Sequence, residues 1–142
     1  MTYLDTGCFV KLYYPEPDSA AVIARIHGQP VCHTPLHELE FVNALQQKVF
    51  FHTATPAQVA AARALVATDL QTGVLVSRGG DWAAILEAAA KLADRYTGTI
   101  GCRSLDILHC AAAKILGVDE FISTDARQKK LAVAMGLNLV TL

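Results

Sequence analysis

The sequence has almost no imbalance of charge. Its 142 residues include 12 Lys and Arg against 13 Asp and Glu, so the formal net charge is −1. Domains that attract nucleic acids through a general electrostatic field carry a clear excess of Lys and Arg. A nucleic-acid role for this chain would therefore depend on a local site.

Metal-binding and redox spacings are also missing. The cysteines form no C-x-x-C pair, and the histidines have no zinc-ligand spacing. Each cysteine lies among apolar or small residues, at Cys8, Cys32, Cys102 and Cys110. This distribution is typical of buried free thiols in a reducing compartment.

The chain has no long apolar run, no basic N-terminal region, no repeat and no linker. Met1 leads directly into a strand-like segment, so neither a signal peptide nor a membrane span is expected. The 53% of apolar residues is enough for one continuous core. We therefore expect one soluble, cytoplasmic domain over residues 1–142, without membrane contact.

What is present is a regular alternation of short apolar segments with capped helical segments. Strands are predicted at residues 3–4, 31–33, 74–76, 120–124 and 138–141. Helices are predicted at residues 7–14, 19–27, 35–51, 57–70, 82–96, 105–116 and 126–135, with a loop at 98–101. Such alternation predicts an α/β fold, a three-layer α/β/α sandwich with a mostly parallel central sheet.

Four carboxylates lie near the boundaries between these predicted strands and helices. Asp5 follows the first strand, Asp125 follows the strand at 120–124, and Glu40 and Asp106 lie in the first turns of helices. Ligands of parallel α/β sheets bind beyond the carboxyl ends of the strands, so the three aspartates can converge there. Converging carboxylates repel one another unless a cation lies among them. Mg²⁺ or Mn²⁺ takes such oxygen ligands, and phosphodiester hydrolysis is the chemistry that suits it.

A purely structural role explains some of these acids better than others. Asp125 precedes a helix and could serve as an ordinary N-cap. Asp106 meets the helix dipole favourably whatever its function. Asp5 is harder to explain this way, because a charge at the end of a buried strand is costly unless it is paired or metal-bound.

The neighbours of the acids leave several roles open. Glu38 and Glu40 lie two apart on a helix and point in different directions, and periodicity does not choose between them. Asn43 lies one turn beyond Glu40 and could orient it. His109 lies one turn after Asp106, where it could hydrogen-bond that carboxylate, contact substrate or be a satisfied structural histidine.

Basic residues near the acids suggest where a phosphate could bind. Arg103, three residues before Asp106, could hold an RNA phosphate beside the metal. The cluster of Arg127, Lys129 and Lys130 is either a solvated helix face or a second phosphate contact. The Ala-rich helix at 57–70 is either closely packed core or an interface.

The segments that carry the acids resemble the PIN-domain ribonucleases, in particular the VapC-type toxins of bacterial toxin-antitoxin modules. The resemblance covers essentially the whole chain, with its motifs in the right order. They are Tyr3-Leu4-Asp5-Thr6, Glu40-Phe41-Val42-Asn43-Ala44-Leu45, Arg103-Ser104-Leu105-Asp106-Ile107-Leu108-His109 and Phe121-Ile122-Ser123-Thr124-Asp125.

The resemblance implies an Mg²⁺- or Mn²⁺-dependent endoribonuclease whose metal-binding and catalytic residues are Asp5, Glu40, Asp106 and Asp125. It selects Glu40 over Glu38, because the family's acid stands three residues before the Asn-Ala-Leu segment. It also implies that Thr6 and Thr124 orient a carboxylate or a metal-bound water. A homodimer and a small antitoxin whose tail enters the active-site groove are the implied partners, beside the RNA substrate.

Two other functions compete with this one. A phosphohydrolase of the haloacid dehalogenase type also begins with a strand-borne aspartate, but it needs a second aspartate where this chain has Gly7. A catalytically silent PIN-like module would bind RNA or a protein partner without cleaving it. The presence of all four acids argues against such a module.

Overall fold

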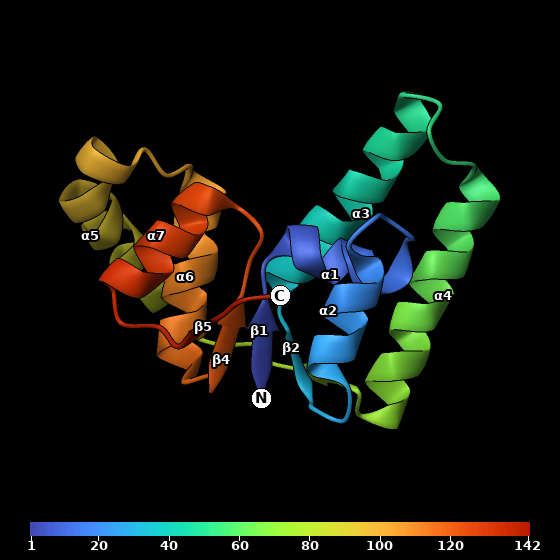
Figure 1. Cartoon of the computed structure of the whole chain (residues 1–142), viewed down its shortest axis with the longest axis horizontal. Helices are drawn as coiled ribbons and strands as arrows, with labels where there is room; N and C mark the ends of the chain where they lie inside the picture. The colour runs from blue at the N-terminus through green and yellow to red at the C-terminus, as the bar shows by residue number, and fades with distance from the viewer.

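A five-stranded sheet lies between two groups of helices in the computed structural model, which describes residues 1–142 (Figure 1). The strand order is β3-β2-β1-β4-β5, and every neighbouring pair is parallel. The strands are β1 (Thr2–Leu4), β2 (Val31–His33), β3 (Leu75–Ser77), β4 (Glu120–Ile122) and β5 (Leu139–Val140). The predicted α/β/α sandwich is confirmed, and its sheet is entirely parallel.

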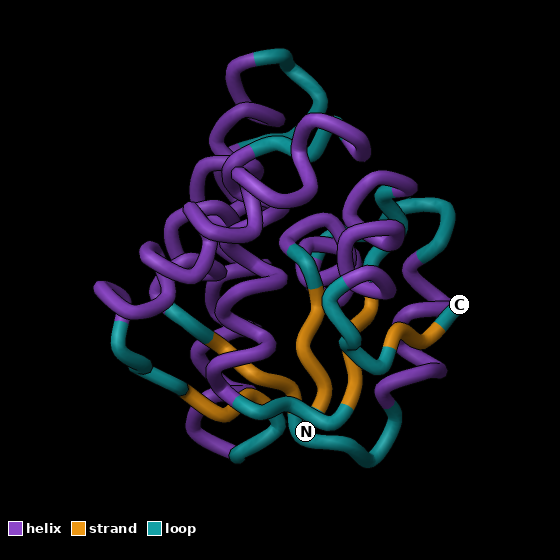
Figure 2. The backbone as a smooth tube through the Cα atoms, turned by 90° about the vertical axis from the view of Figure 1, so that its left-hand side faces the viewer, coloured by secondary structure: helices purple, strands orange, loops and turns teal.

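The helices divide between the two faces of the sheet in chain order. The first group is α1 (Thr6–Tyr13), α2 (Ser19–Ile26), α3 (Pro35–Phe50) and α4 (Pro56–Thr72). The second group is α5 (Trp82–Ile100), α6 (Ser104–Leu116) and α7 (Ala126–Ala134). The groups lie on opposite sides of the strands (Figures 1 and 2). None of these helices is both long enough and apolar enough to cross a membrane.

Two apolar clusters form because successive strand residues point to opposite faces. Leu4 and Ile122 pack against the first helix group, whereas Tyr3 and Phe121 pack against the second. All four side chains are fully buried. This explains why the strands are continuously apolar rather than alternating, as parallel sheets covered on both faces require.

The predicted helix starts are found at the Thr-Pro pairs. Thr34 and Thr55 are the N-caps of α3 and α4, each with proline as the first helical residue. Their side chains accept hydrogen bonds from backbone N–H groups that no helical carbonyl can reach. Gly73, which ends α4, has a φ of 79°, a conformation that favours glycine.

Two predictions about local structure were wrong. Residues 98–101 do not form a loop, because α5 continues to Ile100 and ends at Gly101. One glycine inside a helix costs only about 1 kcal/mol, which the packing of α5 on α6 can outweigh. Strand β4 ends at Ile122 rather than at residue 124. The Ala-rich α4, for which core and interface were both open, buries only Val59, Ala62 and Val66.

The order of strands reverses beside β1. The chain passes from β1 through β2 to β3 on one side and then returns to place β4 on the other side of β1. Asp5 follows β1 directly, and its backbone N–H donates to the carbonyl of Ile122 in β4 at 3.0 Å. The carboxyl ends of β1 and β4 therefore form the switch point at which α/β sheets bind ligands.

Candidate active site

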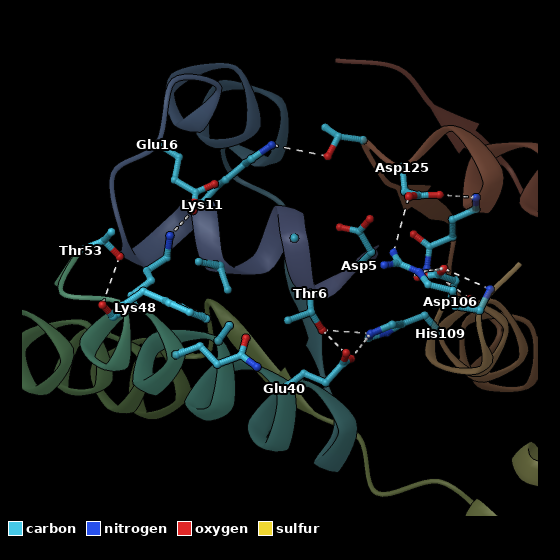
Figure 3. Close-up of a pocket in the computed structure, with 18 residues that line it drawn as sticks. Asp5, Thr6, Lys11, Glu16, Glu40, Lys48, Thr53, Asp106, His109 and Asp125 are labelled. Carbon is cyan, nitrogen blue, oxygen red and sulfur yellow. Dashed lines mark hydrogen bonds and ion pairs between the residues drawn. The ribbon is translucent and has the colours of Figure 1, made fainter.

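An open cleft of about 810 Å³ lies at this switch point, and all four predicted acids line it (Figure 3). They come from the starts of α1, α6 and α7 and from the second turn of α3. Elements that are far apart in the sequence thus bring Asp5, Glu40, Asp106 and Asp125 to one cavity. Only three of its 18 lining residues are hydrophobic, so the cleft suits a polar ligand.

Asp5 is a buried carboxylate with a partner on each oxygen. Its Oδ1 accepts from the backbone N–H of Cys8 at 2.7 Å, which makes Asp5 the N-cap of α1. Its Oδ2 accepts from the hydroxyl of Ser123 at 2.5 Å. These bonds compensate the loss of hydration of a carboxylate that is only 6% exposed.

Ser123 is the site residue that sequence reasoning missed. It is buried and also accepts from the backbone N–H of Asp125 at 3.0 Å, so it joins two acids of the cleft. The prediction instead assigned this role to Thr124, which is exposed and whose Oγ1 accepts only from Lys11 at 3.5 Å. Strand alternation could have indicated the difference, because only one of two adjacent hydroxyls can point inward.

Glu40 is held by side chains from other elements. Its Oε2 accepts from the hydroxyl of Thr6 at 2.7 Å and from Nε2 of His109 at 2.5 Å. Burial raises the pKa of Glu40, but the hydrogen bonds from His109 and Thr6 outweigh it and hold the pKa below its ordinary value. His109 therefore bonds Glu40, and no hydrogen bond joins it to Asp106. Asn43 is exposed and makes no hydrogen bond to Glu40, contrary to the predicted role.

Arg103 spans two acids at the opposite wall. Its Nε donates to Oδ2 of Asp106 at 3.0 Å, and its Nη2 lies 3.6 Å from Oδ2 of Asp125. The arginine side chain is 70% exposed. It thus supplies positive charge to carboxylates that would otherwise repel one another, whereas the sequence suggested a contact with substrate phosphate.

Asp125 is the N-cap of α7 and also faces the cleft. Its Oδ1 accepts from the backbone N–H groups of Arg127 and Gln128, at 2.9 and 2.8 Å, so it is the N-cap of α7. Its Oδ2 remains at the cleft, near Arg103. Neither Lys129 nor Lys130 lines the cleft.

The far wall of the cleft carries two lysines, Lys11 and Lys48 (Figure 3). Nζ of Lys48 lies 2.9 Å from Oε1 of Glu16, and Nζ of Lys11 lies 3.2 Å from Oδ2 of Asp18. In all, five carboxylates and three cationic side chains line the cleft, which leaves a formal charge of −2. A divalent cation would balance that charge.

The donor set also limits how a metal could bind. No three His, Cys, Asp or Glu side chains converge into a ready-made metal site. Zinc prefers such a closed set of nitrogen and sulfur ligands, whereas Mg²⁺ is commonly held by one or two carboxylates and several waters. Asp5 and Asp106 are oxygen donors of the second kind, so the residues present fit Mg²⁺ or Mn²⁺.

A parallel sheet with a polar cleft at its switch point is typical of α/β proteins that bind a ligand at that edge of the sheet. The PIN domain model matches residues 2–134, and the chain belongs to the PIN domain family. PIN domains are typically nucleases. This membership excludes the haloacid-dehalogenase alternative.

Comparison with solved structures agrees on the fold. The crystal structure of FitAcB from Neisseria gonorrhoeae matches with a TM-score of 0.63 and 16% identity, over 99% of this chain and 97% of that chain. At that identity the likeness concerns the fold alone. No curated protein matches the sequence.

Proposed function

We propose that this protein is a metal-dependent endoribonuclease and the toxin of a type II toxin-antitoxin system. The observation that carries the proposal is the meeting of Asp5, Glu40, Asp106 and Asp125 in one cleft at the switch point of a PIN domain. The resemblance of the motifs to VapC-type toxins supports RNA as the substrate and a small antitoxin as the partner. A homodimer in the cytoplasm belongs to the same proposal.

Asp5 and Asp106 would hold Mg²⁺ or Mn²⁺, with Glu40 and Asp125 completing the acidic set. The bound ion would polarise the phosphoryl group and stabilise the charge that develops on it. Asp5 is suited to this task because Ser123 and the α1 backbone fix its orientation. Arg103 would leave Asp106 when the ion binds and would become free to contact the phosphate, since its exposed side chain can move.

The test is cleavage of total RNA by the purified protein with Mn²⁺, scored as new 5′ ends. We expect Asp5→Asn and Asp106→Asn to abolish cleavage while remaining folded, and excess EDTA to abolish it in the wild type. Asp81→Asn is the matched control, because Asp81 caps α5 through Ala84 but does not line the cleft. Full activity of both cleft variants would refute the proposal.

The silent binding module predicts a different pattern. RNA would be retained on a filter equally well with and without Mn²⁺, and no new ends would appear. The toxin assignment has its own test, which is whether a small protein encoded next to this chain co-purifies with it and inhibits cleavage.

A further inference from the structure

A buried chain of hydrogen bonds leads from the core to Glu40. The Tyr3 hydroxyl lies 2.9 Å from Nδ1 of His109, and Nε2 of His109 lies 2.5 Å from Oε2 of Glu40. The Thr6 hydroxyl lies 2.9 Å from Nε2 of His109 and donates to Oε2 of Glu40 at 2.7 Å. Four elements, β1, α1, α3 and α6, thus meet at this one carboxylate.

The direction of each bond follows from what the groups can donate. A carboxylate only accepts, so both Nε2 of His109 and the hydroxyl of Thr6 donate to Glu40. In a neutral imidazole that donates from Nε2, Nδ1 is an acceptor, and the Tyr3 hydroxyl therefore donates to it. In that tautomer every hydrogen of the chain points toward Glu40.

The base of this chain is rigid. Tyr3 and His109 are 0% and 2% exposed. The Tyr3 ring packs against His37 and Phe121, with ring centroids 4.7 and 5.8 Å apart. A side chain packed in this way cannot change rotamer without displacing the core.

The consequence for Glu40 is that its two oxygens differ. Oε2 accepts two hydrogen bonds, whereas Oε1 accepts none from the protein. The side chain is 20% exposed and lines the cleft. A free glutamate would lose rotamer entropy when it is fixed for reaction, and these two hydrogen bonds have already restricted the rotamers of Glu40.

We propose that Tyr3 and His109 are positioning residues that hold Glu40 by Oε2 and present Oε1 to accept a hydrogen bond from a water at the scissile phosphate. The inference rests on the proposed nuclease function. Glu40 then binds the water, and direct metal ligation is left to Asp5 and Asp106. His109 is then neither a substrate ligand nor a merely satisfied core histidine.

Tyr3→Phe tests the first link of the chain, because it removes one hydroxyl and keeps the ring. We expect kcat to fall about tenfold with KM unchanged, since loss of a supporting hydrogen bond in a metal site costs 10–100-fold. Tyr13→Phe is the matched control. Tyr13 is also buried and donates to Asp69 at 2.9 Å, but Asp69, unlike His109, does not line the cleft. The kcat of Tyr13→Phe should therefore stay at the wild-type value.

His109→Leu and His109→Gln test the second link. We expect kcat of His109→Leu to fall about 100-fold and that of His109→Gln to recover part of the loss, because glutamine can still donate to Glu40. A purely structural role predicts instead that both variants lose thermal stability without a recovery of kcat. If His109→Leu does not fold, Tyr3→Phe and His109→Gln still decide the question.

Three failures are distinguishable in this set. Wild-type kcat in Tyr3→Phe and in either His109 variant, with an inactive Glu40→Gln, overturns the positioning role and leaves the nuclease function intact. Full activity of Glu40→Gln overturns the assignment of Glu40 itself. Activity that survives Asp5→Asn and Asp106→Asn overturns the proposed function.

Discussion

Replacing Ser123 by alanine should destabilise the protein far more than the loss of a small hydroxyl suggests. The hydroxyl donates to the buried carboxylate of Asp5 and accepts from the backbone N–H of Asp125. A hydrogen bond to a charged group contributes about 1.5–3 kcal/mol, and a neutral one about 1 kcal/mol. Because Asp5 is only 6% exposed, water replaces the serine poorly there, whereas the bond to Asp125 is only partly buried. We therefore expect a loss of roughly 1.5–3 kcal/mol, most of it from the bond to Asp5.

Urea denaturation followed by circular dichroism measures this loss. We expect the midpoint of Ser123→Ala to fall while the m-value is unchanged, since the folded and unfolded states should expose the same surface. Thr124→Ala is the adjacent control for stability, because the Thr124 hydroxyl accepts only one long hydrogen bond, from Nζ of Lys11 at 3.5 Å. A loss below about 0.5 kcal/mol, equal to that of Thr124→Ala, would show that Ser123 does not support Asp5.

Three further outcomes are expected. Gly98→Ala should raise the unfolding free energy by roughly 1 kcal/mol, because residue 98 is inside a helix. Gly101→Ala should lower it by a similar amount, because the φ of Gly101 is 74°. Equal effects of the two substitutions in denaturant titration would refute the α5 boundary. Burial lowers the pKa of His37 well below 6.5, so below that pH the unfolded chain binds a proton that the folded chain does not. Stability should therefore fall as pH drops below 6.5, by at most about 1.4 kcal/mol per pH unit for this group. His37→Gln should flatten that slope in denaturation measured from pH 7 to pH 5. Arg103→Gln should tighten Mn²⁺ binding measured by calorimetry, because it removes the cation that pairs with Asp106, and weaker binding would contradict this.

Residues with strong local chemistry made most of the fold predictable. Thr34-Pro35 and Thr55-Pro56 mark helix starts whatever surrounds them, because proline suits the first helical position and threonine caps it. Gly98 misled the prediction for the opposite reason. Its effect is small, and the contacts between α5 and α6, which no local pattern reveals, decided where the helix ends.

The site was predictable to a different degree. The positions of Asp5 and Asp125 after strands place them at one sheet edge, and this requires only the parallel topology. The contact of His109 with Glu40 could not be predicted, because the two residues lie 69 apart in the sequence and meet only through tertiary packing. The spacing of His109 and Asp106 on one helix favoured a contact between them. That spacing shows only that the two side chains lie on the same face of the helix, and it does not require a hydrogen bond.

The pairing of β1 with β4 has a consequence for the order in which the protein matures. Thr2 is aligned with Glu120, so the first strand to be synthesised receives one of its two neighbours only when the chain is almost complete. Contacts of such long sequence separation form late and slowly, because a long loop must close first. Asp5 and Ser123 can meet only after that closure, and a ribosome-bound chain that ends before residue 120 cannot contain the assembled cleft. The acidic cleft of this chain is therefore assembled only at the end of translation.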